Sequence, residues 1–445
     1  MTDCSQLSLG FLGRREVVGR FDGGLVSSDG GLLLLREVDR RYGVTAAIAG
    51  CLRDRRQPGK VRQSIHDLVR QRVYQIACGY EDCNDAATLA GDPVFKAAVD
   101  RAPESDPDLA SQPTLSRFEN GLSRTDLYRA AQVLVDLFVA QTAAPPKRIV
   151  LDVDATDDPT HGQQELAFCH GYYDTHCYLP LLCFASPDDG PQQLLAAVLR
   201  PGNVHAGAKT VVILQRIVAR LRAAWPDTPI LLRGDSGLAL PEVYDWCEAH
   251  GVDYLIGLSR NSRLQALAEP FLAHARDEHR QTQTKVRRLH EVRYAADSWP
   301  HERRVIVKAE VTTQGDNPRF VVTSLQDGTP DGLYQRPAER GDIENRIQEL
   351  KNDLAADRTS CHRFLANQGR LLLHAVAFAL LTLLRGLLHG TELATAQAGT
   401  LRTRLLKVGV RVRQTVRRLW LHFASAYPWQ HLWRLLLDRL RASPA

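Results

Sequence analysis

The sequence predicts an α/β protein with a mixed β-sheet, helices on both faces of the sheet, a β-rich insertion, and helical N- and C-terminal regions. In the middle of the chain, short apolar runs rich in β-branched residues alternate with helix-like segments. The two ends show mainly the apolar spacing of helices. At 445 residues the chain is also too long for one core, so several structural units are expected.

Residues 1–145 are predicted to form an N-terminal helical region for DNA binding and assembly. Apolar residues recur near helical spacing over 64–78, where Ser64 is a candidate N-cap, and a second helix is predicted over 125–139. Pro145 and Pro146 then mark a boundary, after which the character of the sequence changes.

Residues 146–260 are predicted to form the first part of a sheet core. Helices are expected over 206–224 and 241–250. Strands are expected at 148–153, 165–169, 178–184, 194–199, 229–233 and 252–258. A run of strands followed by alternating helices and strands is typical of a ribonuclease-H-like mixed sheet.

Residues 261–330 are interpreted as an inserted β subdomain, with strands at 285–294, 303–312 and 319–322 and no helix between 282 and 325. Residues 331–395 return to the core with a helix that carries Glu344. Residues 396–445 complete the chain as a basic region, and the whole segment after Glu344 is expected to be helical.

Basic residues are concentrated near the C-terminus, although the net charge is only +5. Between Leu401 and Trp420 there is no acid, and the cations include Arg411, Arg413, Arg417 and Arg418. A solvated helix face would explain such a run, but uncompensated charge of this density favours contacts with nucleic-acid phosphates.

The longest apolar stretch, residues 371–388, is interrupted by His374 and Arg385, so it is interpreted as a buried helix and no membrane partner is expected. No charged-then-apolar signal peptide is visible. The nine cysteines show no Cys-x-x-Cys pair and favour reduced thiols. These features predict a cytoplasmic protein.

Two aspartates end predicted strands: Asp154 in Ile149-Val-Leu-Asp-Val-Asp154, and Asp235 in Ile230-Leu-Leu-Arg-Gly-Asp235. Asp152 shares a strand face with Asp154 by alternation and stays an alternative to it. Strand-end carboxylates followed by a helix-borne glutamate form the order expected of a two-metal phosphoryl-transfer site.

The glutamate belongs to a charged stripe. Read as an α-helix, the segment places Arg340, Glu344 and Lys351 within roughly 40° of one another. One acid between two cations suits a metal held beside a polyphosphate. Glu349 is a rival that lies about 140° around the helix from this stripe. The interpretation assigns Mg²⁺ or Mn²⁺, which prefer hard oxygen ligands, to Asp154, Asp235 and Glu344.

The helix resembles the Tyr-Arg-Glu-Lys signature that marks one branch of the DDE-type bacterial insertion-sequence transposases. Arg340, Glu344 and Lys351 match three of its four positions, and the tyrosine position falls on Pro337. Tyr334 lies one helical turn earlier and is a possible substitute.

Other motifs carry the same resemblance. Asp154-Ala-Thr156 and Gly234-Asp235-Ser-Gly237 are similar to the motifs that hold the two aspartates of the family. The stretches Asp157-Asp-Pro-Thr-His-Gly-Gln-Gln-Glu165 and His170-Gly-Tyr-Tyr-Asp174 resemble one subgroup of these transposases.

The resemblance implies cut-and-paste transposition: metal-dependent cleavage at element ends and strand transfer into target DNA, by a homodimer that holds two terminal inverted repeats. It implies phosphate contacts from Arg340 and Lys351, and a flipped base held by an aromatic residue of the insertion. Trp299 is the candidate for that role, with a core role as the alternative. A ribonuclease-H-like nuclease without strand transfer and an inactive DNA-binding relic remain as alternative functions.

Overall fold

The computed structural model describes residues 7–142, 144–188, 190–338 and 341–442, which form two compact units. The terminal unit contains residues 1–50, 54–118 and 380–445, and the sheet unit contains residues 51–53 and 119–379. These boundaries differ from the predicted ones at 145 and 395. Helix α7 (Arg124–Gln141) belongs to the sheet unit because Val135 and Phe138 pack into its core.

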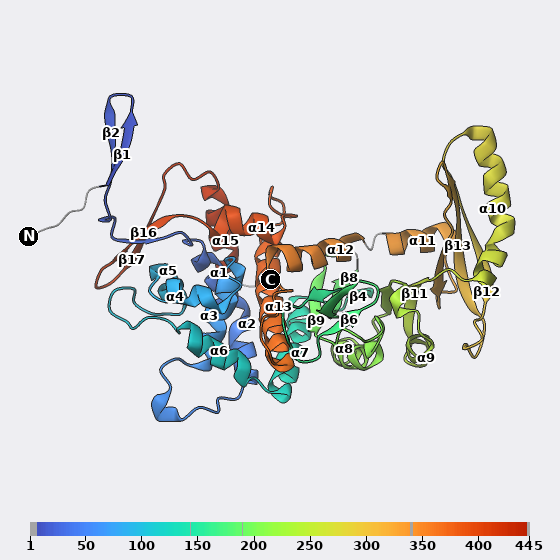
Figure 1. The fold of residues 1–445 in the computed structure, drawn as a ribbon, viewed down its shortest axis with the longest axis horizontal. Coiled ribbons are helices and arrows are strands. Elements are labelled where there is room, and N and C mark those ends of the chain that lie inside the picture. Colours follow the sequence, from blue (N-terminus) through green and yellow to red (C-terminus); the bar gives the residue numbers. More distant parts are fainter. Residues whose placement is uncertain (1–6, 143, 189, 339–340, 443–445) are drawn as a thin grey trace, which may run out of the picture. The chain divides into compact units, whose positions relative to one another are not determined.

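The sheet unit is built around a nine-stranded mixed sheet with the order β12-β13-β15-β11-β10-β4-β8-β9, to which β14 is added beside β13 (Figure 1). Parallel pairing joins β10 to both β4 and β11, whereas β8 is antiparallel to both β4 and β9. This mixed α/β arrangement is consistent with the predicted ribonuclease-H-like sheet. The central strands are β4 (Ile149–Ala155), β8 (Leu181–Pro187), β9 (Gln193–Val198), β10 (Ile230–Gly234) and β11 (Val252–Leu258).

The region predicted as a separate β subdomain instead extends this sheet beyond β11. Its strands are β12 (Val286–Tyr294), β13 (Arg303–Thr312), β14 (Gly315–Asp316) and β15 (Arg319–Thr323), and β15 pairs directly with β11. The region also contains a long helix, α10 (Ser262–Thr282), that the sequence analysis missed. Leu264, Ala268 and Leu272 repeat at helical spacing on the buried side of α10.

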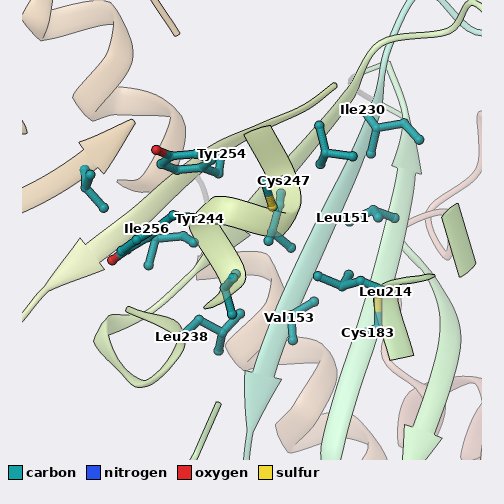
Figure 2. Close-up of a cluster of buried hydrophobic side chains, with 14 of the residues drawn as sticks. Leu151, Val153, Cys183, Leu214, Ile230, Leu238, Tyr244, Cys247, Tyr254 and Ile256 are labelled. Atoms are coloured by element: carbon teal, nitrogen blue, oxygen red, sulfur yellow. The ribbon is translucent and has the colours of Figure 1, made fainter. Parts of the chain in front are cut away.

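One face of the sheet packs against helices α8 (Thr210–Ala224) and α9 (Pro241–Ala249). Figure 2 shows Leu151 and Val153 of β4 in this core, with Leu214 of α8 and Tyr244 of α9. Since side chains alternate along a strand, the even-numbered residues of β4 lie on the opposite face. There Val150 packs with Leu231, Leu255, Ile306, Val321 and Leu333.

The remaining elements of the sheet unit connect or cover the strands. The short strands β5 (Asp158–Pro159), β6 (Phe168–His170) and β7 (Thr175–Tyr178) form a small antiparallel sheet in the order β5-β7-β6. Later in the chain come α11 (Pro330–Ala338), α12 (Gly341–Gln348) and a π-helical segment, η4 (Glu349–Asp353). Helix α13 (Phe364–Gly386) has the length and composition of a membrane span, but 89% of its most apolar window is buried, as in a core helix.

Much of the terminal unit is helical, including the segment predicted over 64–78. Ser64 caps α3 (Ile65–Ala77) in a capping box with Asp67. Further helices of this unit are α1 (Leu32–Tyr42), α2 (Val44–Cys51), α4 (Ala86–Leu89), α5 (Pro93–Ala98), α14 (Ala398–Leu401), the π-helical segment η5 (Arg402–Leu406) and α15 (Gln430–Arg441). Helix α6 (Gln112–Gly121) contains the boundary between the units.

The prediction of purely helical ends was wrong, because both ends contribute strands. A hairpin forms from β1 (Leu7–Leu12) and β2 (Arg15–Gly19). A three-stranded sheet joins β3 (Leu25–Ser27) to β16 (Val410–Gln414) and β17 (Leu419–Phe423). In β16, buried Val410 and Val412 alternate with exposed Arg411 and Arg413, which is the period of a strand.

Candidate active site

The structure places Asp154 and Asp235 level with each other on neighbouring strands. Val153 of β4 is opposite Gly234 of β10 in a parallel pair. The next residue in each case is an aspartate, so both aspartates lie at the carboxyl ends of these two strands. Asp154 is half-buried, and its Oδ1 accepts a hydrogen bond from the amide of Ala155 at 2.9 Å. Asp235 is exposed and its Oδ1 accepts from the Gly237 amide at 2.9 Å.

Glycine at position 237 keeps the chain close to this edge. A Cβ atom there would lie 2.8 Å from the Ala206 side chain and 3.0 Å from Asp235 Oδ1. The Gly237 amide thus holds the Asp235 carboxylate in the tight turn after β10. A residue with a side chain at position 237 would collide with Ala206 and Asp235.

Tyr173, which was not among the predicted site residues, lies in the turn between β6 and β7. Its side chain is half-buried between β6 and β7. Burial, and then the negative charges of Asp157, Asp154 and Asp235, raise the pKa of Tyr173 to about 12. The phenol of Tyr173 therefore keeps its proton at neutral pH. The resemblance of residues 170–174 to a transposase subgroup was the only signal for this residue in the sequence.

Asp152, the alternative to Asp154, is occupied in a buried ion pair. Arg233 lies opposite it on β10 and donates from Nε to Oδ1 and from Nη2 to Oδ2, each at 2.7 Å. Gln192 Nε2 also donates to Oδ2 at 2.7 Å. These contacts saturate a fully buried carboxylate, so they favour Asp154 over Asp152 as a metal ligand.

The helix with the predicted glutamate is not uniform. Glu344 is exposed on α12, whereas Glu349 is buried and forms an ion pair with Arg346. The chain changes from α-helix to π-helix at Glu349, so steps of a regular α-helix do not place Lys351 relative to Glu344. The predicted stripe is therefore interrupted, and its first member, Arg340, lies outside the described residues.

Lys351 is bound to the segment that follows Asp154. Its Nζ donates to Asp157 Oδ1 at 3.0 Å and to the Asp157 carbonyl at 2.9 Å, and it lies 3.4 Å from Thr156 Oγ1. The helical segment after Glu344 is thereby joined to the end of β4. Lys351 and Asp157 are both partly exposed, at 21% and 26% of their side chains.

A second set of contacts, which we term the clamp, joins residues 157–165 to residues 359–364. Thr359 Oγ1 lies 3.0 Å from both carboxyl oxygens of Asp158, and Gln164 Nε2 donates to the Thr359 carbonyl at 2.8 Å. The Glu165 amide donates to the His362 carbonyl, and Glu165 Oε2 accepts from the Phe364 amide, both at 2.9 Å. The motif 157–165 therefore holds the chain on the C-terminal side of η4.

Asp158 in the clamp is buried and largely protonated near neutral pH. Burial, followed by the charge of Asp357, raises the pKa of Asp158 to about 8, against the lowering effects of Thr359 and Lys351. A protonated carboxyl can donate to a hydroxyl as well as accept from one. Its contact with Thr359 thus does not require a buried negative charge.

The two strand-end carboxylates fit part of a magnesium or manganese site. Mg²⁺ prefers hard oxygen ligands and is commonly held by one or two carboxylates together with waters and phosphates. Asp154 and Asp235 supply such oxygens at one edge. Across the described part of the chain, no three His, Cys, Asp or Glu side chains form a group that could hold a metal, so Glu344 does not complete a triad in this structure.

The aromatic candidates for DNA contact pack within the sheet unit. Trp299 makes an edge contact with Tyr244 at 5.2 Å, and the Arg303 guanidinium lies over its ring at 5.1 Å. Tyr334 packs against the other face of the sheet, with Arg287 over its ring at 5.0 Å. These contacts favour the core role for Trp299.

The basic C-terminal candidates form part of the terminal unit. Arg411 and Arg413 lie on β16, and Arg417 and Arg418 lie in the turn that leads to β17. All four side chains are exposed. They lie on a β-hairpin, not on the predicted helix.

Comparison with known proteins identifies one family. The model of the transposase DDE domain, group 1, matches residues 9–445. A search of curated proteins found no match. Among solved structures, the chain is similar to the piggyBac transposase synaptic complex with hairpin DNA, at 10% identity and a TM-score of 0.39, over 93% of this chain and 82% of that one. A likeness of that extent establishes no shared activity.

Proposed function

The chain belongs to the transposase DDE domain family, group 1, and from this premise we propose that it catalyses cut-and-paste DNA transposition. In this proposal the protein cleaves DNA at the ends of a bacterial insertion sequence and transfers the freed 3′-hydroxyls into target DNA. It belongs to the branch with the Tyr-Arg-Glu-Lys signature, and a homodimer holds the two terminal inverted repeats.

The observation that carries the proposal is the level placement of Asp154 and Asp235 on neighbouring parallel strands. With Glu344, these residues would hold Mg²⁺ or Mn²⁺, which supplies activation of the attacking oxygen and stabilisation of the leaving oxygen. Burial and the charges of Asp157, Asp154 and Asp235 keep the Tyr173 phenol protonated, so it could donate a hydrogen bond to a phosphate.

Glu344 must approach the two aspartates when DNA is bound. Lys351 already links its helical segment to Asp157, three residues beyond Asp154. The lysine would contact a DNA phosphate beside this anchor, and Arg340 would do so from the preceding turn, as the family resemblance implies. Each transfer proceeds in line, without a covalent protein intermediate.

The first test is cleavage of a labelled duplex that contains the flanked element end, with Mg²⁺ or Mn²⁺. Wild type should cut at the element boundary, whereas Glu344→Gln should bind the same duplex without cutting it. Glu302→Gln is a matched control, because Glu302 is an exposed acid of the sheet unit between β12 and β13. Equal cutting by Glu344→Gln would assign the third ligand elsewhere, with Glu349 as the next candidate.

The products distinguish the alternative functions. Joining of the cut 3′-end to a second duplex establishes a transposase. Metal-dependent cutting without joining under the same conditions would instead indicate a nuclease. Specific binding of the element end by wild type without any cutting would indicate a DNA-binding relic.

A further inference from the structure

We propose that the β16–β17 hairpin is a ribbon that docks on duplex DNA through its outer face. This inference rests on the proposed function, because it takes DNA as the partner. It goes further in assigning a particular surface and the residues on it. The ribbon is defined as residues 410–423, which include both strands and the turn between them.

The inner face of the ribbon anchors it to the terminal unit. Val410 and Val412 are buried, and β16 pairs with β3. Phe423 makes an edge contact with Trp433 of α15 at 4.7 Å, and its ring fills the space beside Gly30, where a Cβ atom would meet it at 2.7 Å. The hairpin therefore has a fixed base, and its outer side chains need little further ordering when they bind.

The outer face combines positive charge with aromatic rings. In the antiparallel register, Arg411 is opposite His422 and Arg413 is opposite Trp420, so these four side chains share the face away from the buried valines. Trp420 is 45% exposed, and the Arg418 guanidinium lies over its ring at 5.5 Å. Basic groups next to an exposed aromatic ring form a surface suited to a nucleic acid.

The charge on this face is uncompensated, unlike that of Lys407 just before the ribbon, which pairs with the buried Asp29 at 2.8 Å. By contrast, within the described ranges no carboxylate forms an ion pair with the arginines of the ribbon, Arg411, Arg413, Arg417 and Arg418. A partner that supplies several negative charges in a row, such as a DNA backbone, satisfies them.

The tip of the ribbon is a tight turn with an exposed apolar residue. The Thr415 amide donates to the Arg418 carbonyl at 2.9 Å, and the Arg418 amide donates to Thr415 Oγ1 at 3.1 Å. Between them, the Val416 side chain is fully exposed. The major groove of B-form DNA admits a two-stranded ribbon, so strands and turn can enter it together while the arginines reach the phosphates.

The test measures the affinity of the full-length protein for a fluorescent duplex that contains the element end, between 50 and 200 mM salt. Arg411→Ala/Arg413→Ala removes two charges from the ribbon. Arg62→Ala/Arg434→Ala is the matched control, since it removes two exposed arginines of the same unit outside the ribbon. Thermal melting of each variant verifies that the fold is retained.

The ribbon variant should bind more weakly, and its plot of log affinity against log salt should be shallower by about 1.8, since each lost phosphate contact contributes about 0.9. Trp420→Ala should lower affinity by about fivefold or more at every salt concentration without changing the slope. The control variant should retain the wild-type slope.

Three results would overturn the proposal. They are a ribbon variant with the slope of the control, an unchanged affinity in Trp420→Ala, and equal competition by an RNA duplex, whose narrow major groove excludes a ribbon. A wild type that cuts the element end while the ribbon variants match the control refutes only the ribbon. A wild type that binds no DNA refutes the proposed function as well.

Discussion

Replacing Asp152 or Asp154 with asparagine should damage two different properties of the protein, although the two residues share one strand face. The Asp152 side chain is 0% exposed and the Arg233 side chain 10% exposed, and they form two charge-assisted hydrogen bonds of 2.7 Å. Asp152→Asn removes the negative charge and leaves the guanidinium buried without it. Breaking a buried ion pair in this way costs about 3–5 kcal/mol.

That loss is large enough to read directly from thermal unfolding. For a unit of this size, about 1 kcal/mol corresponds to roughly 2–4 °C, so Asp152→Asn should lower the melting temperature of the sheet unit by roughly 6–20 °C. Adding Arg233→Met should recover part of the loss, because the uncompensated cation is then gone.

Asp154→Asn should have the opposite profile. The Asp154 side chain is half-buried at the end of β4. The free energy of unfolding of this variant should therefore differ from that of wild type by less than about 0.5 kcal/mol. Metal-dependent cleavage of the element-end duplex should fall by about 10²-fold or more, as when a transition-state stabilising group is removed. If Asp152→Asn melts like wild type but does not cut, while Asp154→Asn cuts normally, the reasoning is refuted and Asp152 is the ligand.

Three further predictions use the same two assays. Glu349→Gln should lower stability by about 1–3 kcal/mol because Glu349 is buried against Arg346, whereas Glu344→Gln should melt like wild type; equal melting of both would contradict this. Lys351→Met and Asp157→Asn should each slow cleavage and cost less than about 1 kcal/mol of stability, since the pair is partly exposed. Their double variant should cleave no more slowly than Lys351→Met alone, because that change already removes the pair with Asp157 as well as the proposed phosphate contact, and additive losses would refute it. For Asp158, burial raises the pKa from 3.8 to about 8, so the unfolded chain releases a proton that the folded protein keeps. This contribution to stability is fully present below about pH 4 and is lost as the pH rises toward 8. The melting temperature of Asp158→Asn relative to that of wild type should therefore increase from pH 5 to pH 8. A constant difference in melting temperature would argue against a protonated Asp158.

The central strands and several helices could be predicted because their signals are local. Strands β4, β10 and β11 are mainly apolar runs, interrupted by Asp152, Arg233 and Asp253, as expected for strands that are largely buried. Helix α3 begins where Ser64 and Asp67 form a capping box. Asp154 and Asp235 were found for the same reason, since each follows such a run directly.

The extended sheet escaped prediction because its pairing depends on partners far away in the sequence. Nothing within residues 286–323 indicates that β15 pairs with β11, so the extended sheet was interpreted as a separate subdomain. Strand β16 was predicted as a helix because its arginines were interpreted by their charge alone. The alternation of Val410 and Val412 with these arginines is a local pattern that indicates a strand. The charges of Asp157, Asp154 and Asp235 raise the pKa of Tyr173, and only tertiary packing brings these residues into one electrostatic environment.

The clamp has a consequence for the order in which the protein is synthesised. Its partners lie about 200 positions apart, since Asp158 and Thr359 are separated by 201 residues and Glu165 and Phe364 by 199. A nascent chain that has passed Glu344 therefore contains all three proposed ligands before the clamp exists. Only when residues 359–364 have left the ribosome can the clamp add to the link that Lys351 makes with Asp157. A product truncated between these points would keep every acidic ligand and lack the contacts that hold the chain on the C-terminal side of η4.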